Sequence, residues 1–170
     1  NIGLIWRWEL AKAENVILRG HQGRVFSLAF SPDGRLLASG SFDQSIKFWQ
    51  VADDQGLTAT FHGHMYGVRS IAFSPDGNIL SSASADRTVK LWDATNGTHQ
   101  STLAGHKYVV TAVAFSPEGQ TLASASWDRT VKLWNAATGR ARLPRDQKRL
   151  VGREVAHEDV GLQVVVDRGQ

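Results

Sequence analysis

Residues Gly20 to Trp49 read "GHQGRVFSLAFSPDGRLLASGSFDQSIKFW", and this stretch decides the fold because the chain repeats it twice. The copies are "GHMYGVRSIAFSPDGNILSSASADRTVKLW" from Gly63 and "GHKYVVTAVAFSPEGQTLASASWDRTVKLW" from Gly105, at offsets of 43 and 42 residues. In every copy a histidine precedes an aspartate by 22 residues, and the aspartate precedes a tryptophan by six. Fixed periods of this length mark repeat architectures. The sequence therefore predicts a tandem array of one β-rich unit.

Each unit is predicted to form four short strands. In the second copy, residues 68–73 alternate apolar with small or polar side chains, which is the strand period. The Ser-Pro-Asp-Gly that follows is a turn, because proline fixes φ and glycine accepts positive φ. Residues 79–84 and 88–92 are the next two strands, and Asn96-Gly97 is a hairpin signal that leads to a fourth. The unit is a four-stranded antiparallel meander.

The Gly-His opening, the Ser-Pro-Asp-Gly turn, the aspartate six residues before the tryptophan and the pair Trp92-Asp93 resemble the WD-repeat β-propellers. The other two copies carry Trp49-Gln50 and Trp134-Asn135 at this place. The resemblance implies an all-β fold of four-stranded antiparallel blades. With about three full units and partial flanks, we expect an incomplete propeller, which is an open arc.

The chain is expected to divide into three parts. Residues 1–19 resemble the third and fourth strands of a truncated blade, with Leu18 placed like Leu103. Residues 20–139 are the three repeats. Residues 140–170 are a divergent tail, since Pro144 stands where a fourth strand should run. The segment from Ala156 onward is either a decayed fourth repeat or an irregular tail.

Serine, histidine and aspartate recur together, which raises the question of a hydrolase. The resembled family implies instead a buried, hydrogen-bonded tetrad in each repeat. Three equivalent sets favour architecture, since catalysis needs one exposed nucleophile. Ser41, Ser84 and Ser126 lie two residues further on, so the choice of serine stays open. The tetrads expected by position are His21, Ser39, Asp43 and Trp49; His64, Ser82, Asp86 and Trp92; and His106, Ser124, Asp128 and Trp134.

Partner binding is expected at positions that differ between the repeats. On WD-repeat propellers these flank the start of the first strand and precede the turn aspartate. Aromatic residues and arginine dominate the energetics of protein interfaces. The candidates on these positions and in the adjoining loops are Arg24, Phe26, Phe42, Arg69, Tyr66, Tyr108 and Trp127.

Composition narrows the class of function. The 170 residues contain no cysteine and carry a formal net charge of +3. No disulfide or thiolate metal site is possible, and neither a metal-ligand spacing nor a glycine-rich phosphate loop occurs. No transmembrane segment or signal peptide is evident. We therefore expect no cofactor, no membrane contact and a cytoplasmic location. The resemblance to the WD-repeat family implies a non-catalytic scaffold that binds proteins or peptides, in a larger regulatory or signalling protein.

Two alternatives and one physical problem remain. A hydrolase would use one Ser-His-Asp set. In the second alternative, the basic residues of the tail contact nucleic acid or an anionic surface. These residues are Arg140, Arg142, Arg145, Lys148, Arg149 and Arg153.

The physical problem is that propellers close with four or more blades. An open arc leaves sheet faces uncovered, so we expect the isolated chain to associate with copies of itself or to be unstable.

Overall fold

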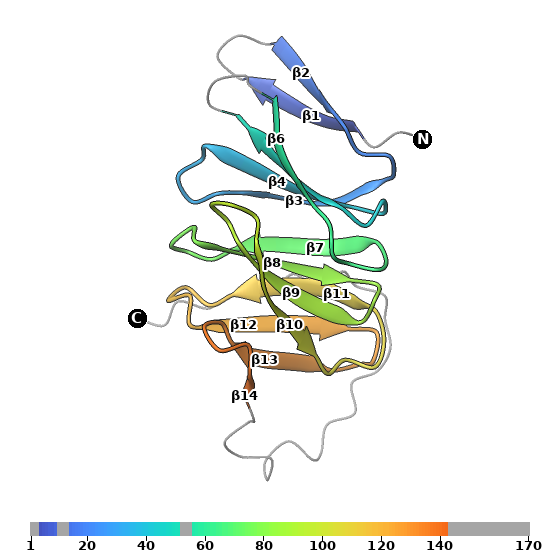
Figure 1. Ribbon diagram of the computed structural model, residues 1–170, viewed down its shortest axis with the longest axis vertical. Helices are drawn as coiled ribbons and strands as arrows, with labels where there is room; N and C mark the ends of the chain where they lie inside the picture. The colour runs from blue at the N-terminus through green and yellow to red at the C-terminus, as the bar shows by residue number, and fades with distance from the viewer. Residues whose placement is uncertain (1–3, 10–13, 52–55, 143–170) are drawn as a thin grey trace.

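The computed structural model describes residues 4–9, 14–51 and 56–142, and every regular element in these ranges is a β-strand. The strands form four antiparallel sheets that follow one another in chain order along the long axis of the molecule (Figure 1). The first sheet pairs β1 (Leu4–Glu9) with β2 (Glu14–Arg19). Each of the other three has four strands and is called a blade. The prediction of an all-β, incomplete propeller is confirmed.

The three blades have the same strand order, in which each strand pairs with the next along the chain. Blade 1 consists of β3 (Val25–Phe30), β4 (Leu36–Ser41), β5 (Ile46–Gln50) and β6 (Gly56–Phe61). Blade 2 consists of β7 (Val68–Phe73), β8 (Ile79–Ser84), β9 (Thr88–Asp93) and β10 (His99–Ala104). Blade 3 consists of β11 (Val110–Phe115), β12 (Thr121–Ser126), β13 (Val131–Asn135) and β14 (Ala141–Arg142). In blade 2 the first two strands have the predicted bounds, and the third ends one residue later than predicted.

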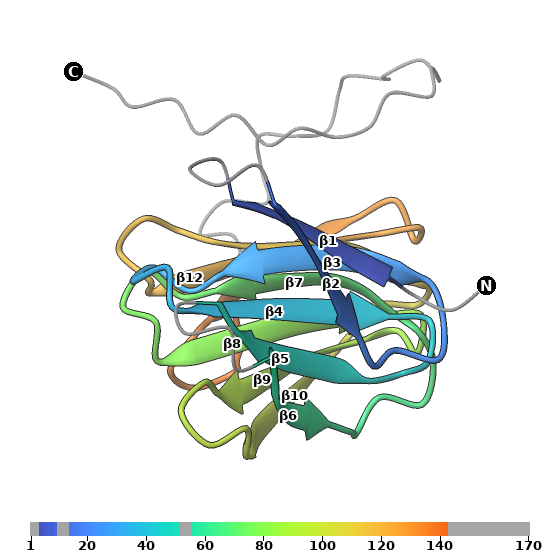
Figure 2. The ribbon, with the colours of Figure 1, turned by 90° about the horizontal axis from the view of Figure 1, so that it is seen from above.

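The first strand of each blade contacts the first strand of the next, β3 with β7 and β7 with β11. Figure 2 shows β3 and β7 from above. Two hydrogen bonds join the first strands across the seams between the blades. The amide of Ile71 donates to Ser27 Oγ at 3.1 Å, and the amide of Val113 donates to Ser70 Oγ at 3.3 Å. The serine in the middle of a first strand therefore ties its blade to the next one.

The hydrophobic core lies between the blades, because each sheet buries its apolar side chains against its neighbour. Each fully buried Val, Leu, Ile or Phe side chain stabilises the fold by roughly 1.5–3 kcal/mol. The seam between blades 1 and 2 contains Ala38, Ile46, Phe48, Phe61, Val68, Ile71, Leu80, Trp92 and Ala94. The seam between blades 2 and 3 contains Ala83, Val89, Leu91, Leu103, Val110, Val113, Leu122 and Trp134.

At the two flanks of the array, the described residues form less than a full blade. In the first sheet Ile5 pairs with Leu18, and in blade 2 Val89 pairs with Leu103 in the same way. Two residues of the fourth strand of blade 3 fall within the described ranges, whereas the fourth strand of blade 2 has six. The proposed boundaries at 19 and 139 stay predictions. Residues 143–170, which include Pro144 and the candidate repeat from Ala156, lie outside the described residues.

Candidate functional site

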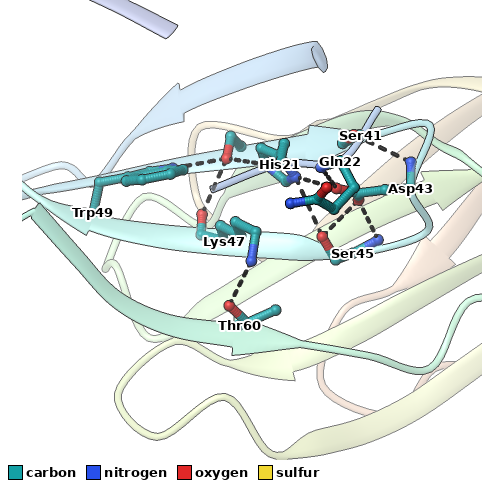
Figure 3. A network of polar contacts seen from close by, with 9 residues as sticks. His21, Gln22, Ser41, Asp43, Ser45, Lys47, Trp49 and Thr60 are labelled. Carbon is teal, nitrogen blue, oxygen red and sulfur yellow. Dashed lines mark hydrogen bonds and ion pairs between the residues drawn. The ribbon is translucent and has the colours of Figure 1, made fainter. Parts of the chain in front are cut away.

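The four residues of the predicted tetrad in blade 1 lie in one chain of hydrogen bonds. Figure 3 shows its labelled members His21, Asp43 and Trp49. Nδ1 of His21 is 2.8 Å from Asp43 Oδ2, and Nε2 is 2.7 Å from Ser39 Oγ. Trp49 Nε1–H donates to the same Ser39 Oγ at 2.7 Å. A carboxylate can only accept, so the imidazole donates from Nδ1 and accepts the serine proton at Nε2. One chain thus satisfies the indole, the hydroxyl, the imidazole and the carboxylate.

The other two repeats contain the same geometry, which the constant spacing of the sequence produces. The corresponding distances from histidine to aspartate, from histidine to serine and from tryptophan to serine are all 2.7–2.8 Å. The networks comprise His64, Ser82, Asp86 and Trp92 in blade 2, and His106, Ser124, Asp128 and Trp134 in blade 3.

The serines two residues further on have a different place in the structure. In blade 2 the Ser84 hydroxyl donates to the carbonyl of Tyr66 at 2.9 Å and accepts from the amide of Asp86 at 3.1 Å. Ser126 makes the equivalent bonds in blade 3, and Ser41 accepts from the amide of Asp43 in blade 1. These serines close the turn between the second and third strands, while Ser39, Ser82 and Ser124 contact the histidines.

The turn aspartate connects two segments that are distant in sequence. Oδ2 of Asp86 accepts from His64 and from the amide of Met65, and Oδ1 accepts from the amide and the hydroxyl of Thr88. The loop before the first strand is thereby fixed to the turn after the second strand. Such a network also orders the loops on which the variable residues lie.

The hydrogen bonds keep the aspartates ionised. Burial alone would raise the pKa of Asp43, but hydrogen bonds from Ser45, the Gln22 amide and His21 outweigh it and hold the pKa at about 2. The pKa values of Asp86 and Asp128 are also lowered, because burial is again outweighed by hydrogen bonds. Burial lowers the pKa of His21 despite the opposing effect of Asp43, so this ring is neutral near pH 7.

The tetrads are poorly placed for nucleophilic chemistry. The side chains of His21, His64 and His106 are at most 1% exposed, and the tetrad serines are buried. Each serine hydroxyl donates to an imidazole while it accepts from an indole. A nucleophile must reach a substrate carbon. The geometry therefore favours a structural role for all three sets.

Four of the predicted partner-binding residues meet at the seam between blades 1 and 2. The guanidinium carbon of Arg69 lies 4.5 Å from the ring centroid of Phe26. The Phe26 and Phe42 rings meet edge to face at 6.2 Å. These residues and Arg24 line a hollow of about 530 Å³. We call it the seam hollow; its lining consists of Gln22, Gly23, Arg24, Phe26, Phe42 and Arg69.

The other three predicted residues are exposed, but they do not line the seam hollow. Tyr66 and Tyr108 are each 62% exposed, and Trp127 is 65% exposed. Met65 was not among the predicted residues, yet it is 76% exposed in the same loop as Tyr66. Its signal is an apolar residue at a position where the other repeats carry Gln22 and Lys107.

Two further hollows lie beside the Ser-Pro-Asp-Gly turns of blades 1 and 2 and the Ser-Pro-Glu-Gly turn of blade 3, at the opposite end of the strands. One of about 420 Å³ separates the turns of blades 1 and 2, and one of about 410 Å³ separates those of blades 2 and 3. They recur with the repeat, so they follow from the spacing of the blades. No predicted site residue lies on this face.

Within residues 4–9, 14–51 and 56–142, no three histidine, cysteine or acidic side chains gather as a metal site would require. The same described ranges contain no helix of the length and apolarity needed to cross a membrane.

Antiparallel four-stranded blades in series, each fixed by a His-Ser-Asp-Trp network, define a repeat protein of the β-propeller class. The chain belongs to the WD-repeat family. The family model described as "WD domain, G-beta repeat" matches residues 13–50, 55–93 and 97–135, which together exceed half of the chain.

The similar curated proteins are WD-repeat relatives from several organisms. Ribosome assembly protein 4 of Saccharomyces cerevisiae is 50% identical over 48 residues, which cover 27% of this chain and 9% of that protein. The Notchless protein homolog of Arabidopsis thaliana is 39% identical over 54 residues, 32% of this chain and 11% of that protein. The U5 small nuclear ribonucleoprotein 40 kDa protein of Pongo abelii is 43% identical over 49 residues, 29% of this chain and 14% of that protein. This chain thus matches only a small share of each relative.

Proposed function

We propose that the chain is a non-catalytic scaffold that binds other proteins, as a part of a larger regulatory or signalling protein. Relatives whose names describe ribosome assembly and a ribonucleoprotein support an interaction role, because such proteins work in complexes. Nothing in those names extends to a particular partner of this chain. A cytoplasmic location is part of the same proposal.

One observation carries the proposal: the repeats keep their buried positions and vary their exposed ones. The turn aspartate is the same residue in all three blades, and it is hydrogen-bonded in each. The residue just before it is Phe42, Ala85 or Trp127, and the two aromatic residues are at least 60% exposed. Exposed aromatic residues on a rigid scaffold are typical of binding surfaces.

Competition capture tests the scaffold role. The 170-residue chain is immobilised, exposed to a cell extract and washed with or without an excess of the same chain in solution. The proposal expects a defined set of proteins that the soluble chain displaces. Retention of no protein, or only of proteins that the soluble chain fails to displace, contradicts it.

A fluorophosphonate probe for activated serines tests the hydrolase alternative. We expect no labelling of the folded chain, because the tetrad serines are buried and doubly hydrogen-bonded. Labelling that disappears in Ser82→Ala would favour an enzyme.

The role of the basic tail is a separate hypothesis. Anion binding that weakens steeply with salt and is lost on removal of residues 140–170 would support it.

A further inference from the structure

We propose that the seam hollow is a site for an acidic side chain of a protein partner, with an apolar residue next to it. The inference rests on the proposed scaffold function, since it names the chemistry that one part of the surface recognises. It concerns the pocket formed by Arg24, Phe26, Phe42 and Arg69.

The seam hollow carries positive charge. Two arginines line the seam hollow, and none of the described residues that line it is acidic. Asp43 is the neighbour of Phe42 in sequence, but it is not among the lining residues. Both its carboxylate oxygens already accept hydrogen bonds, from His21, the Gln22 amide and Ser45. The hollow is therefore complementary to an anion.

The seam hollow also contains a hydrogen-bond donor without a partner in the described residues, Nε of Arg69. Nε of Arg69 is buried, and no acceptor for it exists in the part of the chain that the structure describes. Buried polar groups in proteins nearly always have a hydrogen-bond partner. A carboxylate accepts two parallel hydrogen bonds from the edge of a guanidinium, and Nε is one of the donors on that edge.

The Arg69 side chain is held in place before any partner binds. The Arg69 guanidinium is held against the face of Phe26, and Phe26 is held by Phe42. Stacking on a ring fixes the plane of the guanidinium. Little side-chain entropy is lost when the anion arrives.

The apolar part of the preference comes from Phe42, which is 60% exposed at the rim. An apolar side chain beside the acidic one would cover this ring. The other seam lacks these features, since the positions of Arg24, Phe42 and Arg69 are taken there by Gly67, Ala85 and Thr111. The site is thus specific to the seam between blades 1 and 2.

Fluorescence polarisation with two labelled, end-capped peptides tests the proposal. The first peptide is Gly-Leu-Glu-Leu-Gly, and the second has Gln in place of Glu. We expect the Glu peptide to bind about ten-fold more tightly, the factor that one charge-assisted hydrogen bond confers. Arg24→Gln and Arg69→Gln should each abolish the difference.

Arg35→Gln is the matched control. Arg35 is exposed in the turn at the far end of β3 from Arg24, so its loss changes the net charge equally without touching the hollow. It should leave the preference for Glu intact. The melting temperature of each variant is measured beside its binding, and Arg24, which is exposed, keeps the test decisive if Arg69→Gln unfolds.

Equal binding of the two peptides, or of neither, overturns the proposal. So does a preference for Glu that survives in the folded arginine variants, or arginine-dependent binding of a single-stranded oligonucleotide without binding of the Glu peptide. If capture of partner proteins persists while the peptide preference is absent, only this inference fails. If capture fails as well, the scaffold function fails with it.

Discussion

Val89 and Val131 occupy the same position in the third strands of neighbouring blades, yet Val89 is fully buried whereas Val131 is 62% exposed. Leu91 and Leu133 differ in the same way, at 1% and 46% exposed. Blade 3 covers the first pair, and no described sheet covers the second. At the other end of the arc, Leu28 is 49% exposed, whereas its equivalent Ile71 is 5% exposed.

We predict that the isolated 170-residue chain associates through these uncovered faces. Val131→Lys with Leu133→Lys should increase the monomeric fraction with little loss of stability, because both side chains are already exposed. Val89→Lys at the equivalent buried position should instead cost about 3 kcal/mol or more. Light scattering and urea denaturation measure the two effects. A wild-type chain that is a stable, non-aggregating monomer contradicts the expectation.

Asp86→Ala should lower the free energy of unfolding by about 2–4 kcal/mol, because His64, the Met65 amide and Thr88 all lose their acceptor. Urea denaturation measures the loss. Glu118→Ala is the control, since Glu118 is exposed in the turn after β11. That change should cost less than about 0.5 kcal/mol. An unchanged Tm for the Asp86 variant would falsify the structural role of the tetrad.

Stability should fall on acidification in two steps. Because the pKa of His21 is lowered from 6.5, the unfolded chain takes up a proton first, and the fold loses stability as the pH falls below 6.5. The ionised form of Asp43 stabilises the fold fully above its ordinary pKa of 3.8, and this stability is lost as the pH falls to about 2. Tm measured against pH should show both steps.

Asp43→Asn serves as the reference for the acid step. It removes the carboxylate and keeps the size of the side chain, so its Tm should start lower and fall less steeply below pH 4. Identical slopes for the variant and the wild type below pH 4 would show that Asp43 does not contribute to the acid step.

Gly97→Ala should destabilise the chain more than Gly34→Ala. Both glycines have positive φ, 73° and 71°, so each alanine pays the same backbone penalty of about 1 kcal/mol. A Cβ on Gly97 would in addition collide with the ring of Phe61, whereas one on Gly34 meets nothing within 4 Å. Thermal unfolding of the two variants compares them directly. Equal losses would mean that the Phe61 contact is unimportant.

The strands could be predicted from the sequence because the signals for them are local. Alternation and the Ser-Pro-Asp-Gly turns give β7 and β8 with their observed bounds. The choice between Ser39 and Ser41 could not be made in this way. The two residues lie two apart on one strand, so they share a face. Only the register that pairs Leu37 with Trp49 and Ser39 with Lys47 distinguishes them.

Four of the six residues that line the seam hollow were candidates from the sequence, but the hollow itself was not predicted. Phe26 and Arg69 are 43 residues apart and belong to different blades, so their stacking depends on how one blade lies against the next. The exposure of a strand residue likewise depends on the neighbouring blade and not on the local sequence. Val89 and Val131 have the same neighbours in sequence, Thr-Val-Lys-Leu-Trp, and differ only in what covers them.

The most direct test of the central claim compares two adjacent residues in one turn, Trp127 and Asp128. The affinity for a captured partner protein is measured for Trp127→Ala at a temperature where the wild type is folded. We predict a loss of about ten-fold or more, with the Tm of this variant unchanged, whereas Asp128→Ala lowers the Tm because His106 and Thr130 lose their partner. An unchanged affinity of Trp127→Ala for every captured partner would contradict the claim that the invariant residues hold the fold and the variable ones bind.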